Sequence, residues 1–222
     1  MLYKKPHFEL ILWDWNGTLL NDQIICIDAM NRLLVKRGLP LLTEEKYRRV
    51  FTFPVKTYYA QLGFDFTKEP FEIPALEFME QYHRLLPQAG LFPDAIPVLH
   101  KLKELGYRQL ILSAMEQESL IAAVKNLHVF DYFEQIAGIQ DQYAHGKVNR
   151  AKELFLQKQI SPQNTLLIGD TLHDVEVANE LGCQCLLVAT GHQSAERLQI
   201  NGNPVVKNLR QALEWVIKFK KS

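Results

Sequence analysis

Three short apolar runs in this chain each end in a small polar or acidic residue. The runs and the residues that follow them are Leu10 to Trp13 with Asp14, Leu110 to Leu112 with Ser113, and Leu166 to Gly169 with Asp170. Runs of this length and composition are typical of strands that are buried on both faces of a sheet. Because parallel strands end at one edge of a sheet, the pattern predicts that these polar side chains meet there, where ligands bind in α/β proteins.

The segment between the first two of these runs has the periodicity of helices. Apolar residues recur at helical spacing from Ile24 to Leu34, and the pattern stops at Gly38. Two further helices are predicted, from Pro54 to Leu62 and from Pro70 to Leu86. This segment, residues 22–88, is therefore expected to be a helical insertion in the sheet-forming part of the chain.

From residue 89 onward, predicted helices and strands alternate. An amphipathic helix over Ile96 to Leu105 ends at Gly106, a second covers Ala151 to Gln157, and a last one runs from Leu209 to Phe219. Alternation of this kind yields a parallel sheet covered by helices. The expected fold class is therefore α/β, with a Rossmann-like parallel-sheet core formed by residues 1–21 and 89–222.

Two more polar residues complete the candidate chemistry. Asp174 follows Asp170 by one helical turn, and Lys147 stands at the entrance to the helical pattern that begins at Ala151. The order along the chain is thus carboxylate, hydroxyl, lysine and acidic pair. This order resembles the four motifs of the haloacid dehalogenase (HAD) superfamily of aspartyl phosphotransferases, with Asp14 to Leu19 as the first motif. The resemblance covers nearly the whole chain and is closest to the phosphoglycolate phosphatase-like branch.

The resemblance implies Mg²⁺-dependent hydrolysis of a small phosphomonoester through an aspartyl-phosphate intermediate. Asp14 would be the nucleophile, which divides one difficult hydrolysis into two easier steps. Mg²⁺ would be bound by the carboxylates of Asp14, Asp170 and Asp174 and by the backbone carbonyl of Asn16, since this ion prefers oxygen ligands. In this family the helical insertion is a cap that closes over the site and selects the substrate.

The remaining motif residues would hold the phosphoryl group. Lys147 would neutralise the oxygens of the nucleophile and of the phosphoryl group as a compact cation. Ser113 would bind the phosphoryl group together with Gly17, Thr18 and the backbone N–H near Ala114. Thus the resemblance assigns Asp14, Asn16, Ser113 and Lys147 to catalysis.

The side chain of Asn16 departs from the family pattern. Family phosphatases have a second Asp at this third position, which protonates the leaving alcohol and then deprotonates the attacking water. An amide donates hydrogen bonds but does not carry a proton near neutral pH. Since general acid–base catalysis contributes about 10² to 10⁴-fold, the substitution is expected to slow catalysis while leaving metal and phosphate binding intact.

Asn16 leaves several interpretations open. One is a slower phosphatase that uses another proton shuttle, such as His173. A second is a C–P hydrolase of the phosphonatase type, in which a cap lysine follows the nucleophile by roughly as many residues as Lys56 follows Asp14. A dehalogenase is disfavoured because the acidic pair indicates a metal. A third is a non-catalytic pseudophosphatase that binds phosphorylated ligands. A receiver-type phosphoacceptor is disfavoured by the late position of the acidic pair.

Composition narrows the classes of partner. Lysines and arginines number 25, as do aspartates and glutamates, so charge gives no reason to expect a nucleic acid or an anionic membrane as partner. The early apolar runs are too short for a signal sequence or a membrane span, and a cytoplasmic location is expected. The expected partner is a small phosphorylated metabolite, and the chain is expected to be a monomer or a homodimer.

Overall fold

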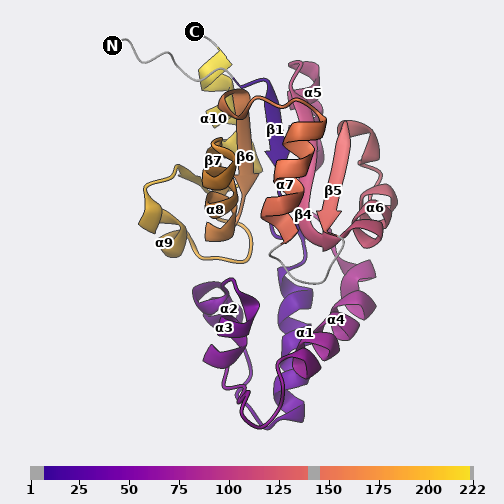
Figure 1. Ribbon diagram of the computed structural model, residues 1–222, viewed down its shortest axis with the longest axis vertical. Coiled ribbons are helices and arrows are strands. Elements are labelled where there is room, and N and C mark those ends of the chain that lie inside the picture. Colours follow the sequence, from indigo (N-terminus) through magenta and orange to yellow (C-terminus); the bar gives the residue numbers. More distant parts are fainter. Residues whose placement is uncertain (1–7, 140–145, 221–222) are drawn as a thin grey trace.

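The computed structural model describes residues 8–139 and 146–220; residues 1–7, 140–145 and 221–222 of the predicted core lie outside this description. Six strands form one parallel sheet in the order β5-β4-β1-β6-β7-β8 (Figure 1). Their bounds are β1 Leu10–Trp13, β4 Arg108–Glu116, β5 Gln135–Ile139, β6 Thr165–Gly169, β7 Gln184–Val188 and β8 Val205–Val206. The predicted α/β fold with a parallel sheet is confirmed.

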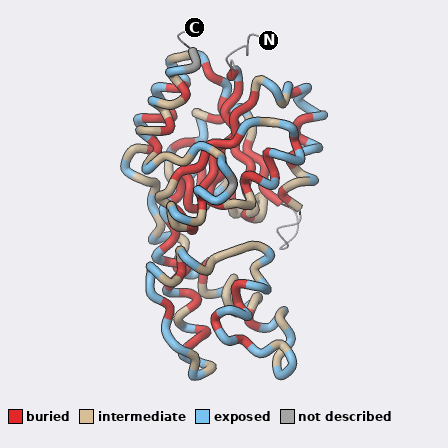
Figure 2. Tube along the Cα trace, turned by 90° about the vertical axis from the view of Figure 1, so that its left-hand side faces the viewer, coloured by how far each residue is buried: buried red, intermediate tan, exposed pale blue. Residues whose placement is uncertain are grey.

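Helices cover both faces of this sheet. They are α5 Ala95–Glu104, α6 Gln117–Asn126, α7 Gly146–Gln157, α8 Leu172–Leu181, α9 Ala195–Leu198 and α10 Leu209–Lys220. Along β1, Leu10 and Leu12 pack into the cluster that contains the buried residues of α7 and α8. Ile11 and Trp13 pack into the cluster that contains those of α5, α6 and α10. The continuous apolar run thus supplies both faces, and the strands form the buried centre of the core (Figure 2).

The segment from residue 22 to residue 88 contains four α-helices. It lies between two short antiparallel strands, β2 Leu20–Asn21 and β3 Gly90–Leu91. Its helices are α1 Gln23–Lys36, α2 Glu44–Val50, α3 Val55–Gln61 and α4 Glu72–Leu85. Figure 1 shows them beyond the carboxyl ends of the central strands, over the sheet edge that the sequence indicated. None of the helices in the described part of the chain is long and apolar enough to cross a membrane.

Helix α2 was not predicted from the sequence. Its one buried residue is Tyr47, so it has no apolar periodicity to detect. It is held in place by polar contacts with the loop that follows β7. Arg48 Nη2 donates to the carbonyl of Ala189 at 2.6 Å, and the backbone N–H of Ser194 donates to the carbonyl of Arg48 at 3.0 Å. These contacts fix the α2 side of the helical segment against the sheet domain.

Candidate active site

The polar residues predicted at the sheet edge do meet there. Asp14 follows β1, Asp170 follows β6, and Asp174 lies in the first turn of α8. Lys147 is the second residue of α7, and its side chain reaches the same place. All four side chains are buried. The parallel register of β1 and β6 explains the meeting, because it pairs Trp13 with Ile168 and so aligns the two strand ends.

Lys147 joins two of these carboxylates. Its Nζ lies 2.5 Å from Asp14 Oδ1 and 2.7 Å from Asp174 Oδ1. Ligand oxygens of Asp14, Asp170 and Asp174 all lie within 4.8 Å of one another. We call Asp14, Lys147, Asp170 and Asp174 the acidic cluster. It contains three carboxylates and one ammonium group, so its ionised form carries an excess of negative charge in a buried space.

The pKa values of the acidic cluster reflect this excess. Burial, together with the neighbouring carboxylates, raises the pKa of Asp14 to about 7 although Lys147 opposes the shift. Burial also raises the pKa of Asp170 to about 6. Burial alone would raise the pKa of Asp174, but Lys147 lowers it below its usual value. Burial alone would lower the pKa of Lys147, but Asp14 and Asp174 raise it above its usual value. Two of the three carboxylates therefore resist ionisation until a cation approaches.

A glycine and a hydroxyl allow the first loop to approach Asp170 closely. Gly17 has a φ of +74°, and a Cβ added there would lie 2.4 Å from Asp170 Oδ2, so no larger residue fits. Thr18 Oγ1 lies 3.2 Å from Asp14 Oδ2 and 3.0 Å from Asp170 Oδ1, and its one proton serves these two carboxylates. Gly17 and Thr18 thus let the loop after β1 lie directly against Asp14 and Asp170.

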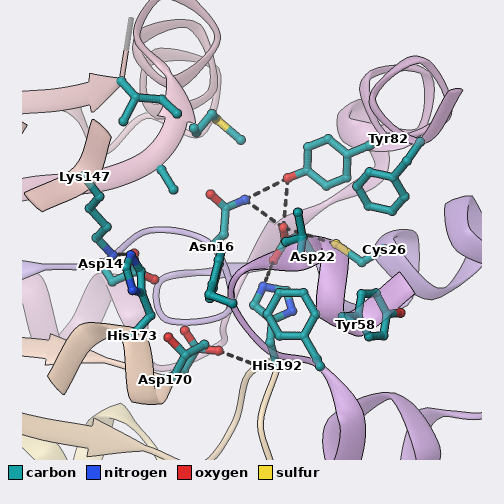
Figure 3. Close-up of a pocket in the computed structure, with 18 of the residues that line it drawn as sticks. Asp14, Asn16, Asp22, Cys26, Tyr58, Tyr82, Lys147, Asp170, His173 and His192 are labelled. Carbon is teal, nitrogen blue, oxygen red and sulfur yellow. Dashed lines mark hydrogen bonds and ion pairs between the residues drawn. The ribbon is translucent and has the colours of Figure 1, made fainter. Parts of the chain in front are cut away.

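Asn16 is held by three side chains in a fixed orientation. Its Nδ2 donates to Asp22 Oδ2 at 2.8 Å and to the hydroxyl of Tyr82 at 2.8 Å. Its Oδ1 accepts from Ser113 Oγ at 3.2 Å. Figure 3 shows the amide pointing toward Asp22 and Tyr82, beside Asp14. Ser113, which the sequence assigned to phosphoryl binding, is fully buried and contacts Asn16.

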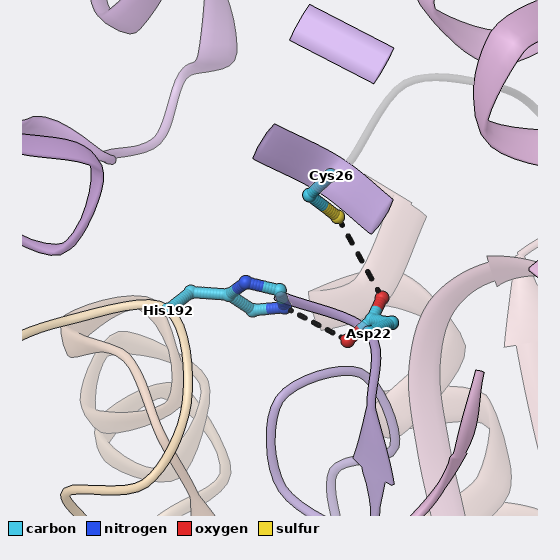
Figure 4. A group of neighbouring side chains, drawn as sticks. All are labelled: Asp22, Cys26 and His192. Carbon is cyan, nitrogen blue, oxygen red and sulfur yellow. Dashed lines mark hydrogen bonds and ion pairs between the residues drawn. The ribbon is translucent and has the colours of Figure 1, made fainter. Parts of the chain in front are cut away.

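A second buried group lies behind Asn16 and consists of Asp22, Cys26 and His192, which we call the paired cluster (Figure 4). His192 Nε2 lies 3.4 Å from Asp22 Oδ1, and Cys26 Sγ lies 3.8 Å from Asp22 Oδ2. His192 Nδ1 is 2.8 Å from the hydroxyl of Tyr47. The backbone N–H of His192 also donates to Asp170 Oδ2 at 2.6 Å, which links the two clusters.

The charges of the paired cluster balance each other. Burial alone would raise the pKa of Asp22, but His192 and the donors around it hold the value below its usual range. Burial alone would lower the pKa of His192, but Asp22 raises it to about 9. Burial raises the pKa of the Cys26 thiol, which therefore stays protonated. One anion faces one cation here.

The two clusters differ in how well they suit a metal ion. The acidic cluster offers hard oxygen ligands, an excess of negative charge and raised carboxylate pKa values, which together suit a divalent cation such as Mg²⁺. The ligand atoms of the paired cluster are equally close to one another. However, its carboxylate is already neutralised by His192 and accepts hydrogen bonds from Asn16 and Tyr82. Only the acidic cluster has charge left for a metal.

Sequence reasoning missed Asp22, Tyr82 and His192. One signal was available, because His192 follows the apolar run Leu186 to Val188, which is the core of β7, in the same way that Asp14 follows β1. Asp22 and Tyr82 gave no signal in the sequence. Their positions depend on contacts between helices α1 and α4 and the loop after β1.

A cavity of about 210 Å³ lies between the sheet edge and the helical segment. Its polar end is formed by Asp14, Asn16, Ala114, Lys147, Asp170 and Asp174. The opposite wall comes from α3, α4 and the residues after α2, and the ends of β4 and β5 add Met115, Glu116 and Ile139 from the sheet edge. A volume below the ~300–1,000 Å³ typical of drug-sized ligands suits a small molecule. The carboxylate of Asp14, the lysine and the acidic pair singled out in the sequence thus line one cavity.

Two residues considered for other roles have definite positions. Lys56 Nζ lies 5.5 Å from the ring centroid of Phe66 and 5.9 Å from that of Phe71, and it is not among the residues that line the cavity. His173 does line the cavity, with Nδ1 2.8 Å from Glu176 Oε2 and its ring centroid 4.8 Å from that of Phe53. Lys56 is therefore occupied away from Asp14.

Known proteins resemble this chain in sequence and in fold. The chain is 24% identical over 196 residues to a probable phosphatase, IndB, of Dickeya dadantii, covering 86% of this chain and 85% of that protein. It is 24% identical over 214 residues to phosphoglycolate phosphatase 1 of Pseudomonas aeruginosa, covering 92% and 78%. A haloacid dehalogenase-like hydrolase structure from Streptococcus pneumoniae superposes with a TM-score of 0.82 at 23% identity, covering 94% of this chain and 98% of that one. Residues 11–188 match the family described as haloacid dehalogenase-like hydrolase, and the chain belongs to this family.

Proposed function

We propose that this chain is a phosphatase that hydrolyses a small phosphomonoester, with Asp14 as the nucleophile and Mg²⁺ as the cofactor. The observation that carries the proposal is the setting of Asp14. Its carboxylate lies at a strand end, lines the cavity, contacts Lys147 at 2.5 Å and has two further carboxylates within 4.8 Å. The names of the two relatives given above, a probable phosphatase and a phosphoglycolate phosphatase, support the same reaction class.

The residues of the site divide the reaction into two steps. In the first, a carboxylate oxygen of Asp14 attacks phosphorus, the ester P–O bond breaks, and the leaving alkoxide takes a proton from solvent. In the second, water attacks phosphorus, the bond to Asp14 breaks, phosphate leaves and the water's proton passes to solvent. Lys147 at Oδ1 and Thr18 at Oδ2 hold the Asp14 carboxylate in place.

Charge stabilisation is shared between the protein and the cofactor. Asp14, Asp170 and Asp174 would hold Mg²⁺, with the backbone carbonyl of Asn16, and the ion supplies positive charge to the phosphoryl oxygens. Lys147 adds a second cation, which Asp174 keeps oriented toward Asp14. We further propose that residues 22–88 act as a cap, because α3 and α4 line the wall opposite Asp14 and their closure would exclude water during phosphoryl transfer.

The second candidate function is a pseudophosphatase that binds phosphorylated ligands without turnover. The observation in its favour is Asn16, whose amide is fixed between Asp22 and Tyr82 and cannot act as a general acid or base near neutral pH. The phosphonatase alternative gains no support from the structure. Its reaction needs a lysine amine close to the substrate, and Lys56 packs on Phe66 and Phe71 outside the cavity lining.

Phosphate release from p-nitrophenyl phosphate, measured with and without Mg²⁺, tests the proposal. We expect turnover that requires the cation and falls by at least about 10⁴-fold in Asp14→Asn, as expected for loss of a nucleophile. Asp28→Asn is the matched control, because Asp28 is exposed on α1. Full activity in Asp14→Asn would exclude Asp14 as the nucleophile. Absence of turnover in the wild type, with phosphate analogues still bound, would favour the pseudophosphatase.

A further inference from the structure

The cavity wall opposite Asp14 is apolar over most of its extent. Its side chains are Phe51, Phe53, Val55, Tyr58, Phe78 and Met79 from the helical segment. Met115 and Ile139, at the ends of β4 and β5 on the sheet edge, add further apolar surface to the lining. Several of the aromatic rings pack on each other, with centroids 5.3 Å apart for Phe51 and Tyr58 and 5.5 Å apart for Phe51 and Phe53. A preformed apolar wall of this kind favours an apolar group on the substrate.

This wall also lacks a cation with charge to spare. Among the described residues that line the cavity, Lys147 is the only lysine or arginine, and it is already paired with Asp14 and Asp174. Arg48, which lies close in the sequence to the wall residues, donates instead to the carbonyl of Ala189 at 2.6 Å. A second anionic group on a substrate would therefore find no free lysine or arginine among these residues.

The histidines in the lining add no net positive charge, because each faces a carboxylate. His173 Nδ1 faces Glu176, and His192 Nε2 faces Asp22. His173 Nε2 is buried and has no hydrogen-bond partner among the described residues, so this ring offers one polar contact beside the wall. Glu116 lines the wall, and the N–H groups of Glu118 and Ser119, with a smaller contribution from His83, hold its pKa below the usual value. His83 thus has an anionic neighbour of its own. A carboxylate on the substrate would be placed beside Glu116, which is ionised at neutral pH.

We propose that the substrate of this site is a monoester of phosphate with a small uncharged, apolar alcohol, and that the site discriminates against a substrate with a second anionic group such as phosphoglycolate. The inference rests on the proposed phosphatase function and specifies its substrate class. The phosphoryl group would lie at the acidic cluster, and the alcohol portion would contact the wall formed by Phe51, Phe53 and Met79. Burying an unpaired carboxylate against such a wall is unfavourable, whereas burying methylene groups there is favourable.

A series of linear alkyl phosphates tests the proposal directly. Ethyl, propyl, butyl and pentyl phosphate have leaving groups of nearly equal acidity, so a trend in kcat/KM with chain length reports burial and not chemistry. We expect an increase of about fourfold per methylene until the chain fills the cavity. Phosphoglycolate should react with a kcat/KM on the order of 100-fold below that of propyl phosphate, which has a similar length but an uncharged alcohol portion.

A charge introduced into the wall should reverse the discrimination. Met79→Lys places an amine on the cavity side of α4, and we expect it to raise kcat/KM for phosphoglycolate relative to propyl phosphate by about tenfold or more. Leu76→Lys is the matched control, because Leu76 lies on the same helix with 59% of its surface exposed and does not line the cavity. This control should leave the ratio unchanged.

The outcomes separate the substrate class from the reaction. A flat dependence on chain length, or phosphoglycolate reacting as well as propyl phosphate, would overturn the proposed substrate class while leaving the phosphatase function in place. If no phosphate is released from any ester, the phosphatase function fails, and calorimetric binding of the non-hydrolysable alkylphosphonates decides the rest. Affinity that rises with chain length would retain the apolar ligand class, and affinity independent of chain length would reject it.

Discussion

The two buried clusters at the sheet edge are built from similar residues but differ in charge. The acidic cluster places three carboxylates around one amine, and the pKa values of Asp14 and Asp170 are raised to about 7 and about 6. The paired cluster places one carboxylate against one histidine, with the pKa of Asp22 lowered and that of His192 raised to about 9. The acidic cluster therefore gains from an added cation, whereas the paired cluster is complete without one.

Closeness of ligand atoms does not by itself identify a metal site, because the charge of the group matters as well. Both groups bring possible metal-ligating atoms within 4.8 Å, so distance alone does not distinguish them. Asp22 already accepts hydrogen bonds from Asn16, Tyr82 and the backbone of Gly17. Its function is to position Asn16 and to connect α1 and α4 to the loop after β1.

The largest expected effect is on stability, from removal of Asp22. Asp22→Asn leaves the buried His192 without its anion, and breaking such a pair should lower the free energy of unfolding by about 3–5 kcal/mol. The loss should be greatest between about pH 4 and 6.5, where both residues are charged in the folded and in the unfolded protein, and should shrink as the pH rises from about 6.5, where histidine in the unfolded chain releases its proton, to about 9, where His192 does so in the folded protein. Urea unfolding at several pH values measures it, with Asp28→Asn as the control. An equal loss at all pH values would contradict the pairing.

The next effect is on turnover, from exchanging the amide and the carboxyl group. In the double variant Asn16→Asp/Asp22→Asn, the hydrogen bond between these residues is retained and a carboxyl group is placed beside the leaving group. We expect kcat to rise by about 100-fold, the lower range for general acid–base catalysis. Asn16→Asp alone should gain less, because it places two carboxylates within hydrogen-bond distance of each other.

Asn126→Asp, on the exposed end of α6, is the control for the added negative charge. Its kcat for p-nitrophenyl phosphate should equal that of the wild type. If the double variant is no faster than the wild type while it remains folded, the missing proton carrier is not what limits turnover.

A smaller effect is expected for the pH dependence of cation binding. Protons and Mg²⁺ compete for Asp14 and Asp170, whose pKa values are about 7 and about 6. The apparent Mg²⁺ affinity should therefore rise with pH, by about 100-fold per unit well below pH 6 and by about tenfold per unit between pH 6 and 7, and level off above about pH 8. Calorimetric titration at each pH gives the affinity. Affinity that does not change between pH 5 and pH 8 would place the ion elsewhere.

The smallest effect is a gain in stability, of opposite sign to that of Asp22→Asn. The pKa of Asp14 is higher in the folded protein than its ordinary value of 3.8, so ionisation of this residue costs stability as the pH rises through 7. In the absence of divalent cations, Asp14→Asn should raise the melting temperature by about 2–4 °C at pH 8 and by little at pH 4. Thermal unfolding in a chelating buffer tests this. A lower melting temperature at pH 8 would contradict the charge excess.

Much of the sheet and of the acidic cluster could be predicted from the sequence, because local patterns encode them. The apolar runs before Asp14 and Asp170 define strands, and parallel pairing brings their ends together. Helices α1, α3 and α4 likewise have clear apolar periodicity or limiting glycines and prolines. The structure, however, turns Ser113 toward Asn16, a contact that the position of Ser113 in the sequence did not indicate.

The paired cluster and the cavity wall could not be predicted, because they depend on contacts between distant segments. Asp22 and Tyr82 are 60 residues apart and Tyr47 and His192 are 145 residues apart. Which aromatic side chains face the cavity depends on how α2, α3 and α4 pack over the sheet edge. A single sequence carries no local signal for either arrangement.

Detection of the phosphoryl group on Asp14 tests the central claim most directly. Because Asn16 cannot deprotonate the attacking water, the covalent intermediate should accumulate during turnover of p-nitrophenyl phosphate, whose leaving group departs without a proton. Rapid acid quenching followed by peptide mass spectrometry should find one phosphoryl group on Asp14 in the wild type and in Asp28→Asn, and none in Asp14→Asn. Turnover with the phosphoryl group on another residue, or with no phosphorylated residue at any quench time, would contradict this mechanism.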